Sequence, residues 1–179
     1  INELAYNPEY QHSVAMTAAS YAAKGHKVLV VSDRVDFLKN CAKLTGDNAV
    51  CVTGAIHHED RAGIIKQIFD DKDVLYGTQS IFSEGISLNI LSCLILATPV
   101  NNEPLLTQLI GRIIRDYEGK QQPVVVDINL IGKTVKNCKA IIKRIIFQML
   151  PVHMSLLSLA FLSLRPLVGK FCFSSYMRL

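Results

Sequence analysis

The stretch KVLVVS, Lys27 to Ser32, decides the fold class of this chain. It is short, rich in valine and barely alternates between apolar and polar residues, which is typical of a strand buried on both faces of a parallel sheet. Four further runs of this kind follow, so five parallel strands are predicted. They are Ala49 to Thr53 (AVCVT), Asp73 to Gly77 (DVLYG), Ser92 to Thr98 (SCLILAT) and Pro123 to Ile128 (PVVVDI).

Longer amphipathic stretches separate these runs. Their apolar residues recur at spacings of three and four, so each stretch is predicted to be a helix that lays one face on the sheet. A further helix, Tyr10 to Ala23, precedes the first strand and is predicted to end before Gly25. This alternation predicts an α/β fold: an open, mostly parallel sheet with helices on both faces. The other predicted helices are Arg34 to Leu44, His58 to Phe69 and Leu105 to Arg115.

The charge of the chain is unevenly distributed. The 179 residues suit one domain and carry a net charge of +4. Residues 1–127 hold 11 Lys or Arg and all 15 Asp or Glu, a net charge of −4, whereas residues 128–179 hold the other 8 basic residues and no acid. Because the first part has no general attraction for phosphate, nucleic-acid binding there must depend on specific groups.

The five cysteines predict neither a disulfide framework nor a zinc site, because they form no CxxC pair and no metal-like spacing with histidine. They are interpreted as reduced thiols of a cytoplasmic protein. No metal site is predicted at His57-His58 either, since adjacent histidines on a loop point in different directions. Residues Ile1 to Tyr10 show no secretory signal, and without an initiator Met we expect a fragment.

The segment Gln108-Leu109-Ile110-Gly111-Arg112-Ile113-Ile114-Arg115 has the most specific chemistry. Gln108, Arg112 and Arg115 are four and three residues apart, so a helix places them on one face. Gly111 removes a side chain and lets another surface approach closely. Two guanidiniums on one face suit phosphoryl oxygens and stay charged at any relevant pH. Taken alone, the same spacing fits two solvated arginines on a surface helix equally well.

This QxxGRxxR segment resembles motif VI of superfamily 2 helicases, and other segments match that family in order. Val28 to Arg34 resembles motif IV, Thr53-Gly54 followed by Glu59-Asp60-Arg61 resembles the TG region, and Thr78 to Leu88 resembles motif V. The resemblance covers residues 10–128 and implies the C-terminal RecA-like lobe of such a helicase. We expect this lobe at residues 1–132 and a basic, apolar tail at residues 133–179.

The resemblance also implies roles for the matching residues. Arg112 and Arg115 are expected to face the γ-phosphate of ATP, with Arg115 as the better candidate for an arginine finger and Gln108 as an accessory contact. Many relatives have Asp where this chain has Ser87, which can still hydrogen-bond a hydroxyl but carries no charge. The expected cofactor-binding residues are Glu84, Gly85, Ser87 and Gly111.

The first lobe of such a motor is expected outside this sequence. No GxxxxGK[ST], DExH or DExD segment occurs here, so the chain has neither a phosphate cradle nor a magnesium carboxylate of its own. ATP and Mg²⁺ are therefore expected on an N-terminal RecA-like lobe of the same protein, and this chain alone is expected not to hydrolyse ATP. The alternative function is a non-catalytic RecA-like module that binds nucleic acid or protein.

Nucleic-acid contacts are expected at the carboxyl ends of strands, where hydroxyls and backbone N–H groups hold phosphates without a basic field. The expected residues are Ser32, Arg34, Thr53, Gly54 and Thr78. Helix capping explains Thr53 and Thr78 equally well. Phosphate contacts read no base edges, so binding is expected to be independent of sequence. The QxxGRxxR and EGxS forms resemble phage-type, DNA-repair and chromatin-remodelling relatives, so DNA is preferred over RNA.

The tail contains twenty residues, 145–164, without a formal charge, which meets the length criterion for a membrane span. Pro151, His153 and several serines weaken that interpretation, and a membrane anchor is the least favoured one. A packed or interfacial helix and a stretch not selected for folding, such as an altered reading frame, are the others.

Overall fold

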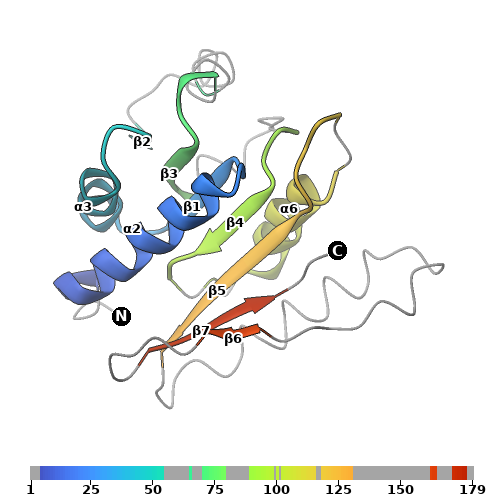
Figure 1. Ribbon diagram of the computed structural model, residues 1–179. Coiled ribbons are helices and arrows are strands. Elements are labelled where there is room, and N and C mark those ends of the chain that lie inside the picture. The colour runs from blue at the N-terminus through green and yellow to red at the C-terminus, as the bar shows by residue number, and fades with distance from the viewer. Residues whose placement is uncertain are drawn as a thin grey trace.

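The computed structural model describes residues 5–54, 65, 70–79, 89–98, 100, 102–115, 118–130, 162–164 and 171–176. Its centre is a sheet of seven strands in the order β2-β3-β1-β4-β5-β7-β6 (Figure 1). The first five of these in space run parallel to one another, which confirms the predicted parallel sheet. They are β1 (Val28–Ser32), β2 (Ala49–Val52), β3 (Val74–Thr78), β4 (Cys93–Leu96) and β5 (Val124–Leu130).

Two strands from the tail extend this sheet. β7 (Phe171–Tyr176) pairs antiparallel with β5, and β6 (Leu162–Leu164) pairs antiparallel with β7. The sequence did not predict them, and a helix over residues 145–164 is wrong for its last three residues. Pairing satisfies the backbone groups along the edge of β5 that the parallel sheet alone leaves open. Among the described residues, no helix is long and apolar enough to cross a membrane.

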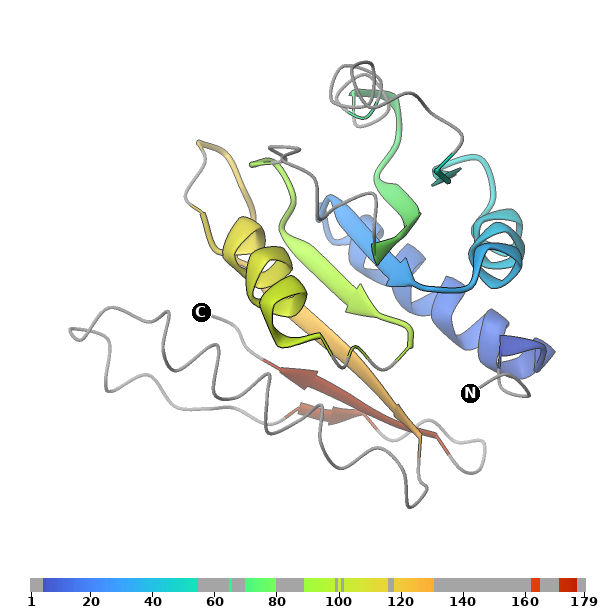
Figure 2. The same ribbon diagram turned by 180° about the vertical axis from the view of Figure 1, so that it is seen from behind.

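Helices cover both faces of the sheet. α2 (Pro8–Ala23) and α3 (Val35–Thr45) lie on one face, and α6 (Glu103–Ile113) lies on the other, as Figure 2 shows from behind. α2 begins two residues before the predicted start because the Asn7 side chain accepts hydrogen bonds from the backbone N–H groups of Glu9 and Tyr10. The helix predicted over His58 to Phe69 lies outside the described residues, apart from Ile65.

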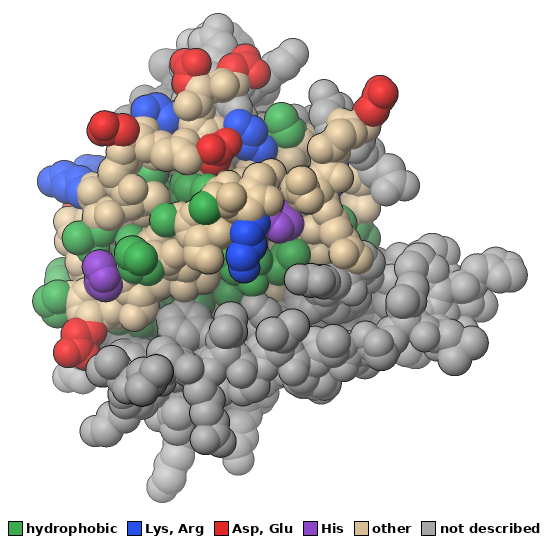
Figure 3. Space-filling view, in the orientation of Figure 1, with side chains coloured by type: hydrophobic (Ala, Val, Ile, Leu, Met, Phe, Trp, Pro, Cys, Tyr) green, Lys and Arg blue, Asp and Glu red, His purple; other side chains and the backbone are tan. Residues whose placement is uncertain are grey.

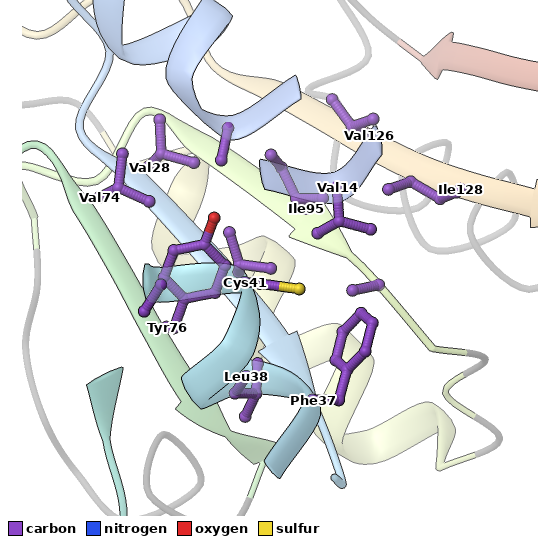
Figure 4. Packing of buried hydrophobic residues seen from close by; sticks show 14 of the residues in the cluster. Val14, Val28, Phe37, Leu38, Cys41, Val74, Tyr76, Ile95, Val126 and Ile128 are labelled. Atoms are coloured by element: carbon purple, nitrogen blue, oxygen red, sulfur yellow. The ribbon is translucent and has the colours of Figure 1, made fainter. Parts of the chain in front are cut away.

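The strands divide their side chains between two cores. Leu29, Val31 and Leu94 pack in the cluster that contains the buried residues of α6, whereas Val28 and Val30 pack in the cluster of α2 and α3. Figure 4 shows the second cluster, where side chains of α2, α3 and the strands meet. Burial on both faces is why the strand runs are almost continuously apolar, and it made them easy to predict.

One buried histidine gives the fold a testable pH dependence. His26 is 9 % exposed, its Nδ1 lies 3.1 Å from the Ser92 Oγ, and its ring meets that of Tyr21 edge-on at 5.6 Å. Burial, and then the positive charge of Lys24, lower the pKa of His26 below its usual 6.5. The folded protein therefore binds this proton less readily than the unfolded chain does. The His26 contribution to stability is complete above about pH 6.5 and decreases as the pH falls towards the folded pKa.

We expect His26→Gln to reduce the loss of stability on acidification. The free energy of unfolding, from urea denaturation at about pH 8 and about pH 5.5, should fall less in this variant than in the unaltered chain. His12→Gln is the matched control, because His12 is exposed on α2. Equal losses in the unaltered and His26→Gln proteins would contradict the assignment.

Candidate nucleotide and nucleic-acid site

A cavity of about 540 Å³ lies at the carboxyl ends of the parallel strands. It is formed where β1 and β3 end and α6 begins, the kind of place where open parallel sheets bind ligands. Two of the predicted site residues, Thr78 and Gln108, meet in its wall. The described residues that line it are Asp33, Thr78, Gln79, Asn102, Pro104, Leu105 and Gln108.

The charge around this cavity is low. Among the described residues that line it, only Asp33 carries a charge. Figure 3 shows acidic and basic side chains interspersed over the described part of the face that carries α2. The described residues therefore offer a polyanion no broad basic field at this cavity, and among them a phosphate must be held by backbone N–H groups, hydroxyls or individually placed arginines.

Ser32 has a different role from the one predicted. Its side chain is 0 % exposed, and its Oγ accepts hydrogen bonds from Thr98 Oγ1 and from the backbone N–H of Arg34, both at 3.2 Å. A direct contact between this hydroxyl and nucleic acid does not fit such burial. Ser32 instead holds the turn between β1 and α3 in place.

The other predicted nucleic-acid residues lie near the surface at the same edge of the sheet. Arg34 is exposed, and its Nε is 3.6 Å from the Asp33 Oδ1. Thr53 is half-buried just beyond β2, and the next residue, Gly54, is exposed. A Cβ on Gly54 would meet no atom of the described residues within 4 Å, so they leave this backbone open to the close approach of a ligand.

The start of α6 is fixed by an asparagine cap that the sequence analysis missed. Asn102 Oδ1 accepts a hydrogen bond of 3.2 Å from the backbone N–H of Leu105, and Pro104 lies in the first turn. An Asn two residues before a Pro at the predicted helix start was the available signal. The cap places the helix start two residues earlier than predicted and brings Asn102 itself into the cavity wall.

Asn102→Ala should lower the free energy of unfolding by about 0.5–2 kcal/mol, because it leaves backbone N–H groups at the start of α6 without a partner. Urea denaturation of the chain measures the loss. Asn102→Asp retains a capping oxygen and should remain close to the unaltered protein. A loss of equal size in both variants would show that the cap is not the cause.

The end of α6 corrects the predicted geometry of the arginines. The helix ends at Ile113 with Ile114 as its C-cap, so Arg115 lies outside it. Only Gln108 and Arg112 share a helical face, one turn apart. Lys120 Nζ donates to the carbonyl oxygens of Ile113 and Arg115, both at 2.6 Å. This cation satisfies carbonyls that the end of the helix leaves open, and apolar periodicity gave no sign of it.

Arg112 and Arg115 nevertheless lie close enough to influence each other. Partial burial of Arg112, and then the charge of Arg115, lower the pKa of Arg112. Arg112 nevertheless remains charged, because a guanidinium loses its proton only at extreme pH. An anion placed between two such cations relieves their repulsion, so this end of α6 suits a phosphoryl group.

Some predicted groups are not placed by the structure. Glu84, Gly85 and Ser87 lie outside the described residues, and Gly111 is partly buried beside Arg112. Neither arginine is among the described residues that line the 540 Å³ cavity. Within the described part of the chain, no group of His, Cys, Asp or Glu side chains is placed to hold a metal ion.

Comparisons with known proteins agree on one family. The family model described as "Helicase conserved C-terminal domain" matches residues 12–117. "Probable helicase D10" of Escherichia phage T5 is 43% identical over 137 residues, which cover 74% of this chain. The match spans only 30% of the length of that relative.

Two solved structures have a similar fold. T4 UvsW matches with a TM-score of 0.56 at 20% sequence identity, over 81% of this chain and 32% of that one. The C-terminal part of the Fun30 ATPase domain matches with a TM-score of 0.55 at 18% identity, over 68% of this chain and 42% of that one. At such low identities, these two likenesses are evidence of fold alone.

Proposed function

Since this chain belongs to the helicase conserved C-terminal domain family, we propose that it is the second motor lobe of an ATP-dependent nucleic-acid helicase or translocase. ATP and its Mg²⁺ are held by an N-terminal RecA-like lobe of the same protein. The present chain, as the second lobe, supplies Arg112 and Arg115 to the γ-phosphate and Gln108 as an accessory contact. Glu84, Gly85, Ser87 and Gly111 form the remainder of the nucleotide contact.

The exposed face of α6 is the observation that supports this proposal most. Pro104 and Gln108 line the cavity at the sheet edge, and Arg112 follows Gln108 by one turn, about 6 Å along the axis. The Arg115 charge lies near that of Arg112. One face therefore leads from the strand ends to Arg112, and Arg115 lies just beyond the end of the helix. A movement of this lobe against the triphosphate is then transmitted to the strand ends by a single rigid helix.

Nucleic acid is the second partner in this proposal, and DNA is preferred over RNA. Thr53, Gly54 and Thr78 hold phosphates at the carboxyl edge, and Arg34 contacts the same nucleic acid from the turn that Ser32 fixes. Their hydroxyl, backbone and single-arginine chemistry does not need a broad basic field, and the described residues around the cavity form none. These contacts are made to the phosphate backbone and not to the bases, so the lobe can move along nucleic acid of any sequence.

The proposal is tested on a two-lobe protein made of this chain and the native sequence that precedes it. ATP hydrolysis is measured alone, with single-stranded DNA and with single-stranded RNA. We expect stimulation by nucleic acid, stronger for DNA, and no hydrolysis by the 179-residue chain on its own. Turnover that is insensitive to both nucleic acids would contradict the motor and favour the non-catalytic interaction module.

We also propose that the lobe proper comprises residues 1–132 of a cytoplasmic protein. Limited proteolysis tests the boundary. A stable fragment that ends near residue 132 supports it. Digestion that removes the tail and β5 together would instead indicate that β5 is protected only while β7 is paired with it, so that β7 is part of the lobe. The second outcome has a structural basis, because β7 pairs with β5 along six residues.

A further inference from the structure

A second cavity, of about 340 Å³, lies between the start of α2 and the start of α3. Asp33 lines this cavity and the first one, so the two adjoin. Figure 1 shows the first turn of α2 at the end of the sheet towards which the parallel strands point. The second cavity therefore extends the edge where nucleic acid is proposed to bind.

An aromatic ring lies open to solvent in this cavity wall. Tyr6 is 73 % exposed and lines the cavity, whereas the neighbouring aromatic residue Tyr10 is 1 % exposed and stacks on Phe37 inside the core. The core thus has its own aromatic pair and does not need Tyr6. An exposed, flat ring beside polar groups is a suitable platform for a base, because every base has a π-face.

The charges of the cavity decide against phosphate as its ligand. The described residues in its wall carry one positive charge, on Arg34, and two negative charges, on Asp33 and Asp36, a formal sum of −1. The Arg34 Nε is also 3.6 Å from the Asp33 Oδ1, so its charge is partly offset. A phosphate gains little electrostatic stabilisation from a wall of this charge, whereas an uncharged polar ring is not repelled by it.

The polar groups that remain match the edge of a nucleobase. Carboxylates accept from the amino groups of bases, Asn40 can both donate and accept, and Arg34 donates to ring nitrogens and carbonyls. The cavity volume is at the lower end of the range of about 300–1,000 Å³ that is usual for small-molecule sites. A cavity of that size has room for one planar base ring.

We propose that this second cavity is a base-binding subsite for single-stranded nucleic acid, in which the Tyr6 ring stacks on one unpaired base. The subsite rests on the proposed function. It adds a contact to a base, because the proposed contacts of Thr53, Gly54 and Thr78 involve only the sugar-phosphate backbone of the nucleic acid. Stacking tolerates any base, so the motor keeps its independence of sequence. A base bound in the subsite fixes the position of the nucleic-acid strand relative to the lobe.

The test uses the full chain and two strands of equal length, oligothymidylate and the same backbone with abasic residues. Fluorescence anisotropy gives the affinities of the unaltered chain, Tyr6→Ala and Tyr6→Phe. We expect Tyr6→Ala to weaken oligothymidylate binding about fivefold or more and to leave the abasic strand unaffected. Tyr6→Phe retains the ring and should bind as the unaltered chain does. Met16→Ala is the matched control, because Met16 is 56 % exposed on α2 and is not among the described residues of either cavity wall.

The outcomes separate the subsite from the proposed function. If Tyr6→Ala and the unaltered chain bind oligothymidylate equally, the base-binding subsite is contradicted, whereas the proposed contacts to the phosphate backbone are unaffected. If the unaltered chain binds neither strand, the proposed nucleic-acid function fails as well. If free thymidine or ATP displaces the bound strand as effectively as unlabelled oligothymidylate does, the cavity is a pocket for free nucleosides or nucleotides. That result would overturn the proposed subsite for a strand.

Discussion

Replacing Arg115 by alanine in the two-lobe protein should lower ATP turnover by roughly 10³-fold or more, while ATP binding stays largely intact. The expected loss is large because, in the proposed function, the guanidinium acts on charge that develops as the γ-phosphoryl group transfers, whereas the first lobe holds the ground-state nucleotide. Steady-state hydrolysis at saturating nucleic acid measures turnover, and binding of a non-hydrolysable ATP analogue measures affinity.

The controls for this experiment use the geometry of α6. Arg115→Lys keeps the charge but loses the planar fork, so it should recover only part of the turnover. Arg112→Ala should also impair turnover, since the two cations act on the same charge. Lys39→Ala removes an exposed cation from α3 and should have no effect. Normal turnover of the Arg115→Ala protein would eliminate the arginine-finger role.

The two arginines differ in ways that make this comparison informative. Arg112 is held by α6 and partly buried, whereas Arg115 lies beyond the C-cap, in a segment tied by Lys120 to the end of the helix. A residue beyond a helix end can move without disturbing the core. Under the proposed function, comparing Arg112→Ala with Arg115→Ala therefore compares an arginine held within α6 with one held beyond its end.

The sheet was predictable because its strands are buried on both faces. Runs such as those of β1 and β4 consist almost entirely of Val, Leu and Ile, which is typical of strands covered on both faces. β6 and β7 were missed, because strands that complete an edge depend on what the neighbouring strand leaves unpaired. Periodicity within the tail does not contain that information.

The candidate site was predictable by residue type and less so by geometry. Thr78 and Gln108 meet in one cavity, as their places after strands and on the motif helix indicated. Buried Ser32 accepts a hydrogen bond from Thr98, which is 66 residues away, and the early end of α6 is accompanied by hydrogen bonds from Lys120. Partners that lie outside the element itself override its local pattern.

Ile110→Ala should destabilise the chain by about 2–5 kcal/mol, the largest effect on stability that we expect from the motif segment. Ile110 is 0 % exposed and packs in the core cluster that contains Leu94 of the sheet. Removing its side chain loses apolar burial and leaves a cavity that the surrounding strands cannot fill. Since a whole domain is stable by only about 5–15 kcal/mol, the urea midpoint should fall clearly.

Two matched variants identify packing as the cause of that loss. Ile110→Val removes less volume and should cost about 0.5–1.5 kcal/mol, and Gln108→Ala, at an exposed position of the same helix, should stay within about 0.5 kcal/mol. If Ile110→Ala costs no more than Gln108→Ala, α6 is not anchored through this side chain. The arginines would then depend on Lys120 and the Asn102 cap for their position. If the expected order holds, the same buried residue that stabilises the lobe also fixes Arg112, two positions away, relative to the strand ends.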